Sequence, residues 1–132
     1  MSRFLVPCAA MLACVLTLAA NGQIRRGKQP DFVAISDAPV EIRGRQNPYD
    51  GQPDAVLEGK KLFHQHCAQC HGDDGRGIGQ AADLRSPAVQ SATPGDLEWF
   101  LRNGNLRYGM PSWSGLPAQR RWQLVVYLKT LR

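Results

Sequence analysis

The feature that most constrains this 132-residue chain is a pair of cysteines with a histidine directly behind them: residues 67–71 read Cys-Ala-Gln-Cys-His. Thiols separated by two residues can add to the two vinyl groups on adjacent pyrrole rings of a haem. A histidine that follows at once lies beneath the ring, where its imidazole can reach the iron. The run therefore predicts one haem c, covalently attached through Cys67 and Cys70, with His71 as an iron ligand.

The first 22 residues have the pattern of a secretory signal peptide. Arg3 precedes a nearly unbroken apolar run that ends at Ala20, and the small residues Ala20 and Gly22 suit cleavage after residue 22. The apolar run is short for a membrane span, which needs about 20 residues. We expect residues 1–22 to be removed and the protein to be exported to the periplasm. Retention of the leader as a membrane anchor is the alternative.

Three other uses of the cysteine pair fit the chain less well. A thioredoxin-like redox pair expects a preceding strand and an α/β setting, and neither is visible in the sequence. A zinc site would need further ligands, but Cys8 and Cys14 leave with the leader and no second cysteine pair remains. A disulfide between Cys67 and Cys70 would constrain almost nothing.

Met110 is the candidate for the second axial ligand of the iron. It is the one methionine left after removal of the leader, and it lies in the run Gly-Met-Pro-Ser-Trp at residues 109–113, where glycine and proline indicate a loop. No other strong iron donor follows His71. The competing donors are His64 and His66, which we expect to lie on the surface.

Residues 52–132 are predicted to form one domain of helices joined by glycine-rich and proline-rich connections. The first helix is expected from Pro53 to about His66, with apolar residues recurring on one face. The second is expected over 94–103, behind Thr93 as a capping residue. The third is expected to start at Pro117 and to run to the end of the chain. We therefore expect an all-α domain, in which haem fills a core that about 80 residues could not stabilise alone.

Residues 23–51 are expected to form a linker or a loosely ordered N-terminal arm. The segment is mostly polar, contains three prolines and shows no sustained helical or strand period. A short apolar patch at residues 32–35 is expected to pack on the domain surface. Its alternative role is that of a docking segment.

The charge balance of the chain argues for protein partners. Sixteen Lys and Arg face eleven Asp and Glu, which gives a formal net charge of +5, reduced by one unit when Arg3 leaves. Such a mild excess fits docking to acidic protein surfaces. It is too small and too scattered for nucleic acid, where basic residues cluster.

The stretch at residues 73–79 contains two aspartates, one arginine and three glycines. It lacks the strand and the lysine of a phosphate-binding loop and the ligand spacing of a calcium loop. We expect turns that wrap the haem edge, and we hypothesise that Arg76 neutralises a haem propionate.

Over residues 55–132 the chain resembles the class I c-type cytochromes in their small bacterial form. The resemblance rests on Gly-Lys-Lys-Leu-Phe at 59–63 followed by the haem-attachment run, on the methionine loop at 109–113 and on Leu-Val-Val-Tyr-Leu at 124–128. One departure is Ala82, which stands where the family often has a proline next to the carbonyl that holds the proximal histidine.

The resemblance implies a cytochrome c fold of three or more short helices wrapped around the haem. The first and last helices are expected to cross, with Gly59 allowing close approach and Phe63 packing near Tyr127. Trp113 is expected to pack beside the haem and to donate its N–H to a propionate.

Haem held by two protein ligands has no open position for a substrate, so we expect a monomeric one-electron carrier and not an enzyme. Its partners would be redox proteins, such as an exported dehydrogenase as donor and an oxidase or another cytochrome as acceptor. The alternatives are a haem subunit of a larger oxidoreductase, and a ligand-binding or peroxidase-like protein in which Met110 stays off the iron.

Overall fold

The computed structural model describes residues 35 and 37–132, and the regular secondary structure of this part consists of helices. The predicted leader and residues 23–34 and 36 lie outside the described residues. Beyond the helices, the described part holds a single antiparallel bridge, between Asn105 and Met110. The all-α prediction is confirmed. The helices are α1 (Val40–Arg43), α2 (Pro53–His66), α3 (Ala68–His71), α4 (Pro87–Ser91), α5 (Pro94–Asn103), the 3-10 helix η2 (Leu106–Tyr108) and α6 (Ala118–Leu128).

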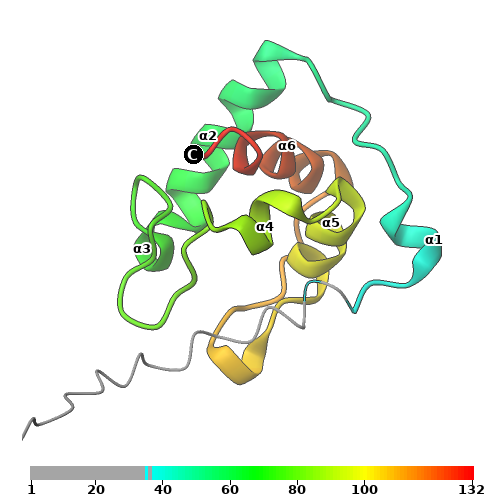
Figure 1. Ribbon diagram of the computed structural model, residues 1–132. Helices are drawn as coiled ribbons and strands as arrows, with labels where there is room; N and C mark the ends of the chain where they lie inside the picture. Colours follow the sequence, from blue (N-terminus) through cyan, green and yellow to red (C-terminus); the bar gives the residue numbers. More distant parts are fainter. Residues whose placement is uncertain (1–34, 36) are drawn as a thin grey trace, which may run out of the picture.

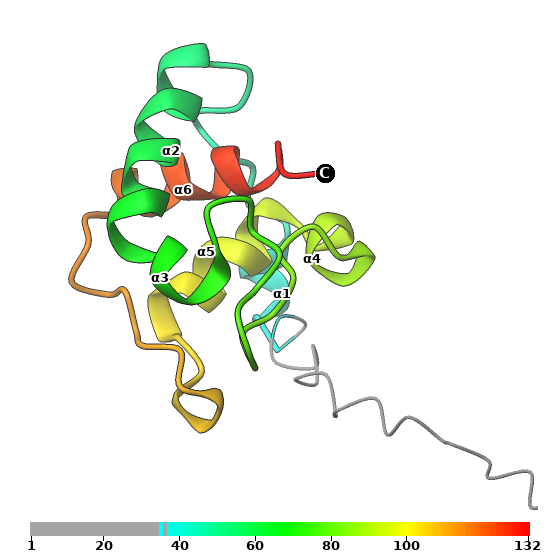
Figure 2. The same cartoon turned by 90° about the vertical axis from the view of Figure 1, so that its left-hand side faces the viewer.

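Helices α2 and α6 cross in close contact and form the centre of the fold (Figures 1 and 2). Gly59 makes the crossing possible, because a Cβ at this position would overlap with the backbone carbonyl of Gln123. One turn further along α2, the ring centroid of Phe63 lies 5.3 Å from that of Tyr127. The first and last helices thus meet as the resemblance implied.

The start of α5 follows from local sequence chemistry. The Thr93 hydroxyl accepts a hydrogen bond from the Asp96 backbone N–H, and the Asp96 carboxylate accepts one from the Thr93 backbone N–H. This capping box satisfies two backbone donors at the helix start, and Pro94 suits the first helical position. Leu97 and Leu101 then bury the inner face of α5.

The third predicted helix ends earlier in the structure than the sequence indicated. Pro117 is the residue before α6, and the helix stops at Leu128, short of the end of the chain. The Leu131 N–H donates to the Leu128 carbonyl, which closes a turn and buries the Leu131 side chain against Gly75. The helix therefore ends at Leu128, because the turn that follows lets Leu131 pack into the core.

From Asp37 onward, the segment expected to be a linker or a loosely ordered arm contacts the helical domain. Helix α1 lies beside α5 (Figure 1), where Gly95 lets the Ile42 carbonyl approach closely. Asn47 is 8% exposed, and its side-chain amide donates to the Trp122 carbonyl of α6 at 2.9 Å. This contact joins residues far apart in the chain, so no local pattern announces it.

Among the described residues, none of the helices has both the length and the apolar character needed to cross a membrane.

Candidate haem site

The cysteine pair lies where α2 passes into the single turn of α3. The Cys67 N–H donates to the Phe63 carbonyl at 2.8 Å, so the α2 hydrogen-bonding pattern continues to this residue. The Cys67 carbonyl then accepts from the N–H groups of Cys70 and His71, at 3.1 and 2.9 Å. This one turn fixes both thiols and the imidazole relative to α2.

A cavity of about 450 Å³ opens beside α3 and brings together five of the residues that the sequence singled out. Cys67, Cys70, His71, Met110 and Trp113 all line it. Its apolar wall combines core residues from helices and connections, namely Ile35, Phe63, Leu84, Val89, Leu97, Phe100, Leu101 and Leu128. A wall of this kind suits a large apolar group better than a polar substrate.

No disulfide joins Cys67 to Cys70, so both sulfurs are available for thioether bonds to haem. Cys67 is half-buried and Cys70 is exposed. Burial raises the pKa of the Cys67 thiol to about 11, and the neighbouring Cys70 adds to the effect.

His71 is oriented by the backbone of the loop that follows it. Its Nδ1 lies 3.0 Å from the Ala82 carbonyl oxygen, which can only accept a hydrogen bond. Nδ1 therefore carries the proton, and the lone pair is left on Nε2, as a metal-ligating histidine requires. The departure at Ala82 does not remove the acceptor, because a backbone carbonyl supplies it.

The loop at residues 72–86 folds back onto α3 and forms one edge of the cavity. The N–H groups of Gly77 and Ile78 donate to the carbonyls of His71 and Cys70, each at 2.8 Å. Further along, Arg85 pairs with Asp83 at 3.0 Å and, by this hydrogen bond, holds the pKa of the Asp83 carboxyl below its ordinary value. The stretch expected to form turns therefore does so beside the cavity.

Met110 lies in the connection between α5 and α6, which Figure 1 shows as an orange loop at the same end of the molecule as α3. Two hydrogen bonds between the backbones of Asn105 and Met110, at 2.8 and 3.0 Å, close the tip around η2. Gly109 supports this closure with a φ of 79°, a left-handed conformation that favours glycine.

Trp113 and His66 meet at the edge of the cavity. Their ring centroids are 5.1 Å apart, and both residues line the cavity. His66 is exposed, as the sequence predicted, and its ring lies at the rim of the cavity. His64 is exposed, and its Nδ1 lies 3.2 Å from an Asp73 carboxylate oxygen.

The structure does not bring Arg76 to the cavity wall. Its guanidinium is mainly exposed and pairs with Asp74, with Nε 2.6 Å from Oδ2. A contact between Arg76 and a haem propionate remains a prediction.

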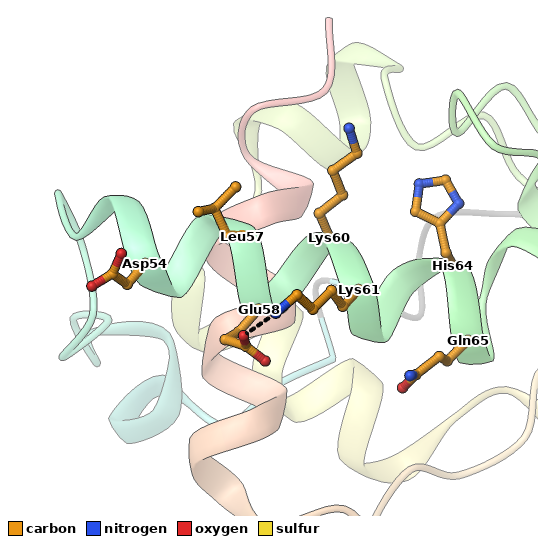
Figure 3. A pocket seen from close by; sticks show the side chains of 7 residues that line it. All are labelled: Asp54, Leu57, Glu58, Lys60, Lys61, His64 and Gln65. Carbon is orange, nitrogen blue, oxygen red and sulfur yellow. Dashed lines mark hydrogen bonds and ion pairs between the residues drawn. The ribbon is translucent and has the colours of Figure 1, made fainter.

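A second hollow, of about 620 Å³, lies on the outer face of α2 (Figure 3). Its side chains come from one helix and are mostly charged or polar, with Lys61 paired to Glu58 at 2.6 Å. This hollow lacks the cysteines, the apolar wall and the loop contacts of the first cavity. We therefore place the functional site beside α3.

Comparison with known families decides the identity of the fold. The family described as cytochrome c oxidase, cbb3-type, subunit III matches residues 54–128, which is more than half of the chain. The chain belongs to the cytochrome c family. Haem c is covalently bound in this family, and this cytochrome carries it.

Two known proteins are similar to this cytochrome. Cytochrome c550 of Pseudomonas aeruginosa is 33% identical over 93 residues, covering 65% of this chain and 62% of the relative, so less than two thirds of that protein is spanned. The crystal structure of cytochrome CL from Methylophaga aminisulfidivorans matches with a TM-score of 0.58 at 18% identity, over 83% of this chain and 71% of that one. The second likeness shows the fold alone.

Sequence reasoning missed one feature of this cytochrome that bears on the site. Glu98 and Arg121 form a buried ion pair between α5 and α6, with Nε 2.8 Å from Oε1. A signal was available, because Arg121 precedes Leu124, Val125 and Leu128 at the spacing of one helix face. A charge on the inner face of a helix predicts a buried partner.

Proposed function

We propose that this cytochrome is an exported one-electron carrier whose haem is attached through Cys67 and Cys70 and whose iron is ligated by His71 and Met110. The observation that carries the proposal is the shared cavity, which these four residues line although they come from two separate segments. Their chemistry fits haem c: two thiols at vinyl spacing, an imidazole with Nε2 free to bind a metal, and a thioether.

Each of these residues has a definable task. The Ala82 carbonyl keeps the proton of the neutral His71 imidazole on Nδ1, which leaves Nε2 as the ring atom that can ligate a metal. The apolar wall limits water at the iron and so tunes the potential. Haem c supplies one electron as its iron cycles between ferric and ferrous, and a methionine ligand favours the ferrous state. Ligation of the iron by both His71 and Met110 would leave no position on the metal for a substrate, which favours a carrier over an enzyme.

The leader and the net charge support a location and a class of partner for the carrier. Residues 1–22 support export, and the mild basic excess supports weak, fast docking to acidic surfaces of redox proteins. We propose an exported dehydrogenase as donor and an oxidase or another cytochrome as acceptor, with a monomer as the working form.

A second candidate function is that of a haem subunit in a larger oxidoreductase. The observation in its favour is the matching family, whose description names a subunit of an oxidase. Purification of the exported protein under gentle conditions separates the candidates, because a subunit would elute with stoichiometric partner chains and a free carrier would elute alone.

The ligation is tested by comparing the wild type with Met110→Ala and with Leu106→Ala. Leu106 is a suitable control because it lies in the same loop, is 77% exposed and does not line the cavity. Ferrous Met110→Ala should bind carbon monoxide readily, and its potential should fall by about 0.1 V or more, since axial ligands govern haem potentials. The wild type and Leu106→Ala should resist carbon monoxide and share one potential.

Rapid binding of carbon monoxide by the wild type, at the rate of Met110→Ala, would contradict the proposal. The iron would then be open, and a ligand-binding or peroxidase-like function would replace that of a carrier.

A further inference from the structure

Stability alone does not explain the buried ion pair between Glu98 and Arg121. The two residues are 3% and 7% exposed, and they join α5 to α6. Removing two charges from water costs about as much free energy as their attraction returns, so a buried pair is weak evidence of stabilisation. A pair retained in the core of a small domain therefore calls for another explanation.

The remaining contacts of Arg121 supply that explanation. Its Nη1 is within hydrogen-bonding reach of three backbone carbonyls, those of Leu116, Ser114 and Trp113, with the contact to Leu116 the shortest. All three belong to the segment between Met110 and α6. One guanidinium thus connects the end of the methionine loop to Glu98 on α5.

The other attachments of this loop lead to the C-terminal end of α5. The Trp113 N–H donates to the Leu101 carbonyl at 2.9 Å, and the Ser112 hydroxyl donates to the Arg102 carbonyl at 2.6 Å. Arg121 adds a connection from α6, at the other end of the loop. Contacts from α5 and from α6 therefore converge on residues 112–116, directly after Met110.

We propose that Arg121, oriented by Glu98, is a positioning residue that holds the methionine loop closed and so keeps Met110 on the iron. The inference rests on the proposed function, because it takes Met110 to be the axial ligand. The planar fork of an arginine suits this task, since Nε binds the carboxylate while Nη1 binds the loop. A lysine offers one ammonium group and cannot span both.

The proposal predicts how easily an external ligand displaces Met110. Cyanide binds ferric haem only when the methionine leaves, so its binding rate at saturating cyanide measures how often the loop opens. A guanidinium bonded to several carbonyls makes strong, charge-assisted contacts, and their loss should raise this rate about tenfold or more.

The test uses the exported holoprotein and the double variant Glu98→Met/Arg121→Met. Removing both charges avoids an unpaired buried glutamate, which could by itself prevent folding. The matched control is Lys129→Met. Lys129 lies directly after α6 and, like Arg121, donates to backbone carbonyls, but these belong to Gln90 and Ala92, outside the methionine loop. Arg121→Lys is the second variant, for use if the double variant fails to incorporate haem. Its cyanide binding should also be faster than that of the wild type.

Four outcomes decide the matter. A double variant that binds cyanide about tenfold faster than the wild type and Lys129→Met, with an unchanged urea midpoint, supports the proposal. If the double variant and the wild type bind cyanide equally slowly while Met110→Ala binds it fast, the role of Arg121 is overturned and the ligation by Met110 stands. Equal acceleration in Lys129→Met overturns it too, because general loosening would then explain the effect. A wild type as fast as Met110→Ala overturns the ligation itself.

Discussion

At the scale of single residues, backbone carbonyls orient the side chains that matter most. His71 is held by the Ala82 carbonyl at 3.0 Å, and Arg121 reaches the carbonyls of the methionine loop. A carbonyl carries no titratable charge, so both contacts persist at any pH at which the fold persists. This arrangement also explains why alanine suffices at position 82, because the side chain there is not the acceptor.

Gly59 gives the sharpest prediction at this scale. Gly59→Ala should lower the free energy of unfolding by about 1–3 kcal/mol, because the added methyl group overlaps with the Gln123 carbonyl and forces α2 and α6 apart. Urea unfolding of the holoprotein measures the change. Gly44→Ala is the control, since Gly44 has open space around it and a helical φ of −72°.

A Gly59→Ala protein as stable as Gly44→Ala would contradict this prediction. The two helices would then cross with more room than the structure gives them.

At the scale of elements, the helices that were predicted correctly are those with local signals. Pro53 and the one-sided apolar spacing marked α2, and Thr93 with Asp96 marked α5. The packing of the segment from Asp37 onward and the early end of α6 depend on contacts between residues distant in the chain. No propensity or spacing within the segment itself could have revealed them.

Asn47 tests whether the segment before α2 belongs to the domain. Asn47→Ala should cost about 1–3 kcal/mol of unfolding free energy, because the Trp122 carbonyl loses a buried partner and the Tyr49 N–H loses its acceptor. Urea unfolding of the holoprotein again provides the measurement. Asn103→Ala should stay within about 0.5 kcal/mol, since Asn103 makes the same type of bond, to Trp99, on the exposed surface.

A loss for Asn47→Ala no larger than that for Asn103→Ala would mean that the segment is a dispensable arm after all.

At the scale of the whole molecule, the fold is organised around a space that its own side chains leave open. Without haem, the apolar wall of this cavity of about 450 Å³ would face water, and exposed apolar surface costs about 25 cal/mol per Å². An ordinary domain is stable by only about 5–15 kcal/mol, so this loss would weaken the whole fold. The haem is therefore part of the core as well as the redox centre.

Loss of the attachment points should consequently abolish the fold. Cys67→Ser/Cys70→Ser cannot form thioether bonds, so we expect a protein without covalent haem that lacks near-ultraviolet circular dichroism and a cooperative urea transition. A double variant that unfolds cooperatively without haem would show that the helices alone form a sufficient core.

Motif and elimination predicted Cys67, Cys70, His71 and Met110, and the family resemblance predicted Trp113; all five line the cavity. The sequence did not predict the pair of Glu98 and Arg121. A buried ion pair depends on which two helix faces meet, and that is a property of the assembled molecule.

The most direct test of the central claim is the visible absorption spectrum of the exported protein, first ferric and then reduced. His71 and Met110 as joint ligands predict sharp low-spin bands of c type and, in the ferric form, the weak long-wavelength band of a methionine–iron bond. A high-spin ferric spectrum would show an open iron and remove Met110 from the ligand set. A spectrum without haem bands would contradict the account as a whole.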